Sequence, residues 1–221
     1  MSIPTTVYLT KYPVHQALAV DHPGKPQRGW DLDSPVFRHR ATMHLFPQIN
    51  EATPRADANI LFRLDTAPGS APFFLIQSLH EPTGVETAQI KMVELTTPDA
   101  ESTIAFRLAV NAIKRKADGG ITPIAFDQDE HKDGVPGMTD WLNQKLSPAL
   151  TGIELLNHQR QVLGTDRRGA KRGSDFAVQV DTVDGFAQVA DPAHLQELLL
   201  KGVGRAKSYG CGLLSIRVLE S

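Results

Sequence analysis

The stretch that sets the fold is SPVFRHRATMHLFP, residues 34–47, which carries the start and stop signals of one short helix. The hydroxyl of Ser34 can accept a hydrogen bond from an otherwise unpaired N–H of the first turn. Pro35 occupies the first helical position, where its missing N–H costs nothing. We expect the helix to run to about Phe46 and to be stopped by Pro47.

Strands are predicted on both sides of this helix, because apolar and polar residues alternate there with a period of two. The expected strands are Thr6–Tyr12, Asn59–Asp65, Phe73–Leu79, Gln89–Thr96 and Thr103–Val110. The order strand, helix, strand, strand suits a small α+β sandwich of the ferredoxin-like type, whose full pattern is βαββαβ.

The second half of the chain has a similar order of elements, with a less regular middle. It predicts a helix over Thr139–Leu146, a hairpin over Gln159–Val180, a helix capped by Asp191 and ended by Gly202, and a closing strand through Leu214, Ile216 and Val218. We therefore predict an α+β chain of two tandem ferredoxin-like domains. The boundary is expected near residue 98, which gives domains of residues 1–97 and 98–221.

Composition places the chain among ordinary globular proteins. Apolar residues make up 41% of the 221 residues and charged residues 22%, which excludes disorder of the whole chain. No stretch approaches the ~18 consecutive apolar residues of a membrane helix, and the N-terminus lacks the pattern of a secretory signal. The single cysteine, Cys211, cannot form an internal disulfide, so a cytoplasmic location is the simplest interpretation.

Positive charge is concentrated in two segments, although the net charge is only −2. Residues 160–172 contain five basic residues and one acid, and residues 201–207 contain three basic residues and no acid. The basic residues are Arg160, Arg167, Arg168, Lys171 and Arg172, then Lys201, Arg205 and Lys207. A polyanion responds to such local fields, so nucleic acid is a candidate partner, and a solvated charged loop is the alternative.

The predicted first helix separates two histidines. At 100° per residue, Phe37, Ala41 and Leu45 form an apolar stripe. His44 lies only about 20° from Phe37 on this wheel, so we expect it in the core. His39 lies about 160° away, so we expect a free side chain there that can transfer protons near neutral pH.

The glycine-rich segment from Gly202 to Gly212 could approach a ligand closely, but it lacks the spacing of known phosphate-binding loops. A flexible turn is therefore the alternative. The acidic run Asp127–Gly134 resembles a calcium loop only superficially, because Lys132 and Met138 replace the required glycine and glutamate. We predict no metal and no cofactor.

Two of these segments together resemble a known family. The C-terminal GVGRAKSYGCGLLS, residues 202–215, resembles the glycine-rich signature of CasE, the CRISPR-associated endoribonuclease of the type I-E Cascade complex. Residues 34–47 resemble the first helix of that family, with its catalytic histidine and terminal Phe-Pro. The resemblance implies two ferredoxin-like (RRM-like) domains and metal-independent cleavage of precursor CRISPR RNA at the base of the repeat hairpin.

The resemblance also implies roles for individual residues. His39 matches the catalytic histidine, and the family's RNA-binding basic hairpin corresponds to residues 160–172. Many relatives carry a tyrosine one turn before the histidine, where this chain has Val36. The expected RNA-binding residues are Arg160, Arg167, Arg168, Lys171, Arg172, Arg205, Lys207 and Ser208. The expected partners are the repeat RNA, as precursor and as mature crRNA, and other Cascade subunits, with no membrane.

Two other functions stay open at this point. The chain could be a tandem RRM-like subunit that binds hairpin RNA without cutting it, which the loss of the tyrosine at Val36 keeps possible. It could also be a metal-dependent hydrolase that uses the acids of residues 127–133. If it is a nuclease of the CasE type, the RNA 2′-OH attacks the adjacent phosphorus, and His39 acts either as base or as acid.

Overall fold

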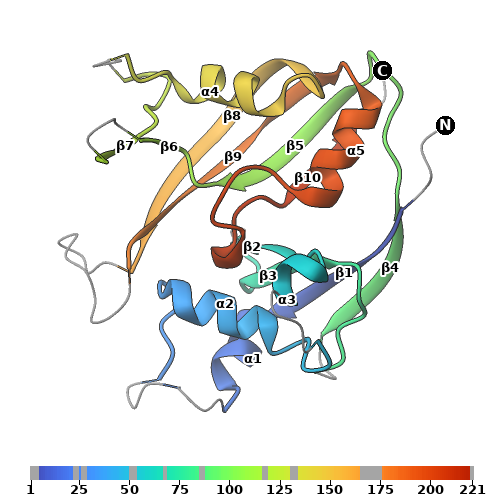
Figure 1. Cartoon of the computed structure of the whole chain (residues 1–221), viewed down its shortest axis with the longest axis vertical. Coiled ribbons are helices and arrows are strands. Elements are labelled where there is room, and N and C mark those ends of the chain that lie inside the picture. The colour runs from blue at the N-terminus through green and yellow to red at the C-terminus, as the bar shows by residue number, and fades with distance from the viewer. Residues whose placement is uncertain are drawn as a thin grey trace.

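The computed structural model describes residues 5–21, 25, 29–49, 54–66, 69–84, 88–115, 119–129, 134–164 and 176–219. Two four-stranded antiparallel sheets dominate the molecule, one from each half of the chain (Figure 1). The structure thus confirms the predicted α+β class. Within these ranges no helix combines the length and the apolar character that crossing a bilayer would require.

The first sheet has the strand order β2-β3-β1-β4, which is the ferredoxin-like order. Its strands are β1 (Thr5–Pro13), β2 (Leu61–Asp65), β3 (Phe73–Ser78) and β4 (Gln89–Leu95). Helices α1 (Val14–Ala19), α2 (Pro35–Met43) and α3 (Pro54–Asp57) connect β1 to β2. Between β3 and β4, residues 79–84 and 88 form no helix, so the second helix of the βαββαβ pattern is not seen in them.

Helix α2 begins as predicted and ends earlier. Ser34 Oγ accepts a hydrogen bond from the backbone N–H of Phe37 at 3.3 Å, and Pro35 is the first helical residue. After Met43 the chain tightens, because Leu45 and Phe46 donate their N–H groups to the carbonyls three residues earlier. Phe37 packs edge-on against Phe74 of the sheet, with ring centroids 6.2 Å apart, and so anchors α2 on the first core.

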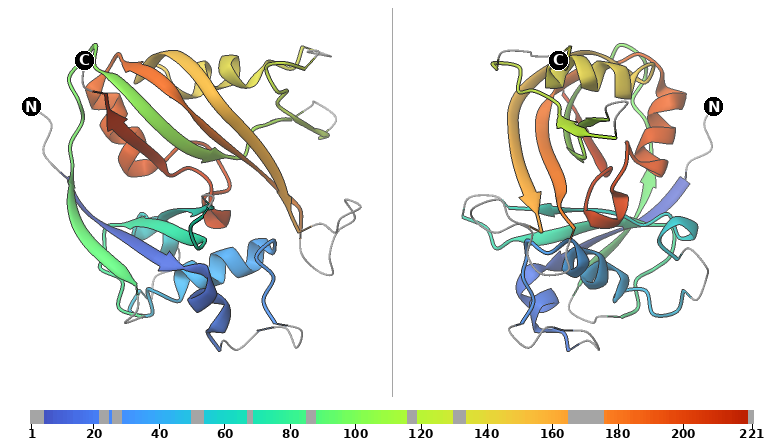
Figure 2. Two further views of the ribbon diagram at one scale, coloured as in Figure 1. Left: turned by 180° about the vertical axis from the view of Figure 1, so that it is seen from behind. Right: turned by 60° about the vertical axis from the view of Figure 1, so that its left-hand side comes forward.

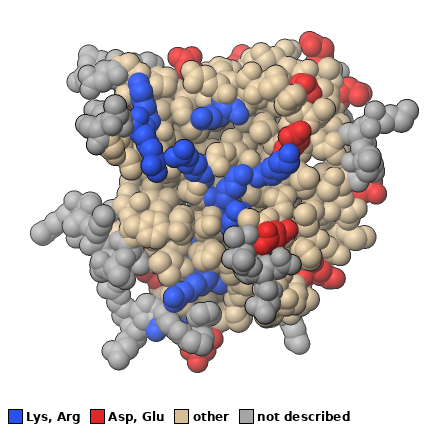
Figure 3. All heavy atoms as spheres, in the orientation of Figure 1, with Lys and Arg blue, Asp and Glu red and all other residues tan. Residues whose placement is uncertain are grey.

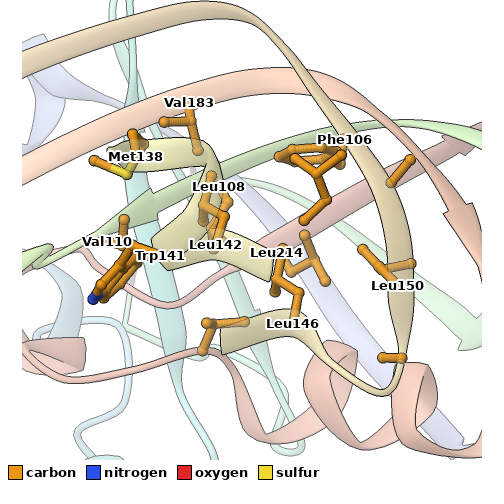
Figure 4. Close-up of a cluster of buried hydrophobic side chains, with 14 of the residues drawn as sticks. Phe106, Leu108, Val110, Met138, Trp141, Leu142, Leu146, Leu150, Val183 and Leu214 are labelled. Atoms are coloured by element: carbon orange, nitrogen blue, oxygen red, sulfur yellow. The ribbon is translucent and has the colours of Figure 1, made fainter. Parts of the chain in front are cut away.

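The second sheet has the strand order β10-β5-β9-β8 and shows the complete βαββαβ pattern. Its elements are β5 (Thr103–Val110), α4 (Met138–Leu146), β8 (Leu150–Leu163), β9 (Val178–Val189), α5 (Pro192–Lys201) and β10 (Leu214–Val218). A small hairpin of β6 (Ile113–Arg115) and β7 (Ile121–Pro123) is inserted after β5. Figure 4 shows Trp141 and Leu142 of α4 beside Val110 and Leu108 of β5, and Leu146 near Leu214 of β10, in the second core.

The two halves meet through a partly buried network of charged side chains. Arg63 of β2 binds Asp65 at 2.8 Å and donates to Ser215 Oγ of β10 at 2.7 Å. Arg107 of β5 lies 3.8 Å from Asp65 and also pairs with Asp184 of β9. These contacts fix the first sheet against the second, so a site can be built from both.

Candidate functional site

Helix α2 directs His39 away from the first core, as the helical wheel predicts. Phe37, Ala41 and Leu45 all lie in that core. His39 is nevertheless not free, because the short helix η1 (Lys207–Tyr209) of the second half packs against α2. The imidazole is partly buried and interacts with the backbone of Ser208. The expectation of an open histidine is therefore wrong, since the covering segment comes from a distant part of the chain.

The surroundings of His39 favour its neutral form. Burial lowers the pKa of His39 below its ordinary value of 6.5, and this cause outweighs the Ser208 backbone, which raises the pKa. The positive charges of Arg55 and Arg40 lower the pKa further. The ring atom Nδ1 is buried without a hydrogen-bond partner among the described residues. At neutral pH the imidazole is thus mostly uncharged and can accept a proton.

His44 differs from the wheel prediction. It forms the C-cap of α2, one residue beyond the helix, and is only partly buried. It lines a narrow cleft beside Trp30 and Phe37 instead of entering the core. Phe37, Ala41 and Leu45 already fill the core on this side of the helix, and His44 lies at its edge, beside Trp30 and Arg40.

The glycine-rich segment forms a fixed loop, which excludes the interpretation as a merely flexible turn. Val203 N–H donates to the carbonyl of Gly212 at 2.9 Å, and Gly212 N–H donates to the carbonyl of Ala109 at 2.7 Å. Gly202 and Gly210 adopt positive φ angles of 73° and 95°, which favour glycine. The loop carries η1 from the second half to the first, beside α2 and β2 (Figure 1).

Basic side chains gather around this contact and across the middle of the face seen in Figure 3. Lys207 donates to the carbonyl of Lys201 at 2.6 Å, and burial together with the charge of Arg55 lowers the pKa of Lys207. Arg205 is exposed and, with Arg115 and Lys145, lines a hollow of about 210 Å³.

Sequence reasoning did not find Arg55, Arg115 or Lys145. They stand outside the two basic runs and approach Lys207 or Arg205 only in the folded chain.

The predicted basic hairpin is confirmed as a strand pair, because β8 and β9 pair from Leu150 with Val189 to Leu163 with Val178. Arg160 on β8 is held by the protein itself: its Nε lies 2.7 Å from Asp181 Oδ1, and its guanidinium lies 4.6 Å from the centroid of the Phe126 ring. The other residues predicted here, Arg167, Arg168, Lys171 and Arg172, lie outside the described residues.

The acidic run contributes a helix cap in the part that the structure describes. Asp127 accepts hydrogen bonds from the backbone N–H of Thr139 at 2.9 Å and from its hydroxyl at 2.7 Å, at the start of α4. The described ranges contain no group of three or more His, Cys, Asp or Glu side chains placed to hold a metal ion. Glu130, His131 and Asp133 lie outside those ranges.

The fold and the site define a tandem ferredoxin-like protein in which a mostly uncharged histidine lies among cations at the contact of the two halves. A family model described as "CRISPR associated protein" matches residues 7–217. The chain belongs to this family of CRISPR-associated proteins, in the Cse3/CasE group, which confirms the resemblance found in the sequence.

Two curated relatives match over most of their length. The CRISPR-associated endoribonuclease Cse3 of Thermus thermophilus is 28% identical over 204 residues, which are 84% of this chain and 91% of that protein. The Cascade subunit CasE of Escherichia coli K12 is 27% identical over 208 residues, which are 87% of this chain and 96% of that protein.

Solved structures confirm the fold. Thermus thermophilus Cse3 bound to an RNA that represents a pre-cleavage complex has a TM-score of 0.67 at 23% identity, with 96% of this chain and 99% of that chain covered. Cas6e from Escherichia coli K-12 has a TM-score of 0.61 at 20% identity, with 97% and 100% covered. These likenesses bear out the two ferredoxin-like domains.

Proposed function

We propose that this protein is a metal-independent endoribonuclease that cleaves precursor CRISPR RNA at the base of the repeat hairpin and stays on its product as a Cascade subunit. Family membership and the names of the two curated relatives support the reaction and the complex. One observation carries the assignment of the site: His39 of α2 lies where η1 packs against that helix, with a lowered pKa and cations nearby. A cytoplasmic location belongs to the same proposal.

The chemistry uses the RNA's own nucleophile. The 2′-OH attacks the adjacent phosphorus, the bond from phosphorus to the 5′-oxygen breaks, and the products carry a 2′,3′-cyclic phosphate and a 5′-OH. A mostly neutral His39 can take the proton of the 2′-OH, a contribution typically worth about 10²–10⁴-fold. Its lowered pKa favours this role as base over that of acid at neutral pH.

Nearby cations would stabilise the charge that develops on the phosphoryl oxygens. Arg55 and Arg40 act electrostatically on His39, and Arg55 acts on Lys207 as well. In a partly buried site such fixed charges are worth more than in water. Val36 has no hydroxyl, so the proton for the leaving 5′-oxygen must come from another group or from water.

RNA would bind through phosphates and shape, which is how an A-form stem is read. The proposed contacts are Arg160, Arg167, Arg168, Lys171 and Arg172 of the hairpin segment, and Arg205, Lys207 and Ser208 of the glycine-rich loop. Ser208 stands directly beside His39, so a phosphate held there would be close to the imidazole.

Labelled repeat RNA mixed with the protein in EDTA tests the proposal. We expect cleavage with a 2′,3′-cyclic phosphate end, and we expect His39→Ala to slow single-turnover cleavage by at least ~10²-fold while RNA affinity changes only a few-fold. Intact RNA that shifts in a gel would favour the non-catalytic subunit, the alternative supported by Val36. Cleavage that needs added metal, or that is normal in His39→Ala, would contradict the proposal.

A further inference from the structure

The two arms of the β8–β9 hairpin contact α2 and η1, the two elements around His39, at the end of the hairpin where their connecting segment begins. In Figures 1 and 2 the end of this long hairpin lies beside the beginning of α2. One arm ends at Leu163 and Gly164, and the other arm starts at Phe176. In the sequence, the basic residues from Arg167 to Arg172 lie between these two arms. Contacts made by the ends of the arms therefore link the segment that carries these residues to the candidate active site.

The β8 arm is tied to the first turn of α2 by a chain of hydrogen bonds. Arg38 Nη2 donates to Gln161 Oε1 at 2.9 Å, and Gln161 Nε2 donates to Asp33 Oδ1 at 2.7 Å. The backbone N–H of Gly164 donates to the carbonyl of Asp33 at 2.8 Å. Arg38 Nε also donates to the carbonyl of Leu32 at 3.0 Å. Arg38 directly precedes His39 in α2.

Arg38 donates its hydrogen bonds to neutral acceptors. Its residue is only 2% exposed, and burial lowers the pKa of its guanidinium to about 10, so it remains charged at neutral pH. The nearby charge of Asp33 also favours the charged form by raising this pKa. No carboxylate of the described residues forms an ion pair with it. A buried charged donor that loses an acceptor is costly, so the side chains of Arg38 and Gln161 orient each other strongly.

The β9 arm contacts the other wall of the site. The ring of Phe176 meets Tyr209 of η1 edge-on, with centroids 4.9 Å apart. Tyr209 follows Ser208, whose backbone interacts with His39. The two arms also touch closely, because a Cβ added to Gly164 would lie 2.5 Å from the carbonyl oxygen of Phe176. The arms should therefore shift as one unit.

We propose that Arg38, Gln161 and Phe176 are positioning residues that transmit the binding of RNA on the β8–β9 hairpin to the geometry around His39. The inference rests on the proposed ribonuclease function. RNA bound on the hairpin would restrain both strands. The contact between Arg38 and Gln161 would then fix α2, and the contact between Phe176 and Tyr209 would fix η1, on the two sides of the imidazole. In-line attack depends on the placement of the reacting atoms, and a misplacement of about 1 Å can cost about 10²-fold in rate, so loosening either contact should slow cleavage more than binding.

The test compares Gln161→Ala and Phe176→Ala with wild type. Both residues are exposed, so both variants should fold. Phe176→Ala should melt like the wild type, whereas Gln161→Ala takes one acceptor from the buried Arg38 and should lower the Tm by a few degrees. The rates are therefore compared well below both melting temperatures. Gln159→Ala is the matched control, because Gln159 is an exposed glutamine two residues earlier on β8 and makes no side-chain hydrogen bond within the described residues. The measurements are single-turnover cleavage at saturating protein, and Kd for repeat RNA with a 2′-deoxy nucleotide at the cut site.

We expect each variant to lower the saturating rate about tenfold, in line with the loss of one hydrogen bond to a charged group or one aromatic contact, with Kd within about threefold. The double variant should lose more than either single variant. The pH midpoint of the rate should stay in place, because neither substitution changes a charge. Gln159→Ala should behave as wild type.

Wild-type rates in both variants would overturn the inference, and so would a loss confined to Kd, which would make these residues RNA contacts. The His39→Ala measurement separates this failure from that of the proposed function. If His39→Ala is inactive while Gln161→Ala and Phe176→Ala cleave normally, only the positioning role is wrong. If His39→Ala cleaves normally, the proposed site itself is wrong.

Discussion

Replacing Gly202 by alanine should destabilise the protein much more than the same change at Gly204. Both glycines have nearly the same positive φ, 73° and 72°, so both alanine variants carry backbone strain of about 1–3 kcal/mol. The two sites differ in how much room an added Cβ would have. A Cβ at Gly202 would lie 2.7 Å from Leu61 Cδ2 and 2.8 Å from the carbonyl oxygen of Gly212, whereas a Cβ at Gly204 meets nothing within 4 Å.

The overlap at Gly202 should add about 1–3 kcal/mol, because Leu61 and the carbonyl of Gly212 are both buried and have little room to move. For a protein of this size each kcal/mol lowers the Tm by about 2–4 °C, so the two variants should differ by roughly 2–12 °C. Thermal and urea melts of both variants measure this difference. The shifted loop would also move η1 away from α2, so Gly202→Ala should cleave more slowly below its Tm. Equal stabilities would refute this account of the loop.

Three further predictions concern charge and histidine. Because the pKa of His39 is lowered, the single-turnover rate of cleavage at subsaturating protein should be level near neutral pH and should fall as the pH drops through that lowered pKa; Arg55→Gln removes a charge that lowers the pKa and should move the midpoint upward, whereas Arg217→Gln should not. His44→Ala should lower the Tm by a few degrees and change the saturating cleavage rate less than ~3-fold. A large loss of rate with an unchanged Tm would instead make His44 the catalytic histidine and contradict the assignment of His39. Replacing Arg167, Arg168, Lys171 and Arg172 by alanine should raise Kd and flatten the slope of log K against log salt by up to about 0.7–0.9 per lost phosphate contact, and slopes equal to wild type would leave this run as a solvated loop.

The elements predicted correctly from the sequence are those fixed by neighbouring residues. Ser34 caps α2 and Asp191 caps α5 through hydrogen bonds that span two or three residues, so the pattern alone is sufficient. Helix α1 was not predicted, because its N-cap residue Pro13 offers no side-chain cap and its six residues depend on packing by Val14 and Ala17. The β6–β7 hairpin was also missed, since its strands have only three residues each and flank a charged segment.

The sequence was sufficient to select His39 as the candidate catalytic residue, but it did not predict the groups that surround the imidazole. The wheel placed His39 away from the core from its own helix alone, and that part holds. Its burial, its lowered pKa and the approach of Arg55 depend on contacts that no local pattern encodes. Arg160 shows the same limit, because a basic run in the sequence does not reveal that Asp181 and Phe126 already hold one of its members.

The two segments that resemble the family lie more than 150 residues apart in the chain and are neighbours in space. The glycines of residues 202–212 do not themselves face His39; they allow the sharp bends that carry Ser208 to it. Helix α2 in turn supplies an imidazole with a buried, unpartnered Nδ1 at the place where η1 arrives. Neither segment is a complete site alone, so a change that only displaces the loop should impair cleavage as surely as a change of the histidine. The glycines of the signature are therefore better understood as the bends that bring Ser208 to His39, while the proposed RNA contacts of this loop belong to Arg205, Lys207 and Ser208.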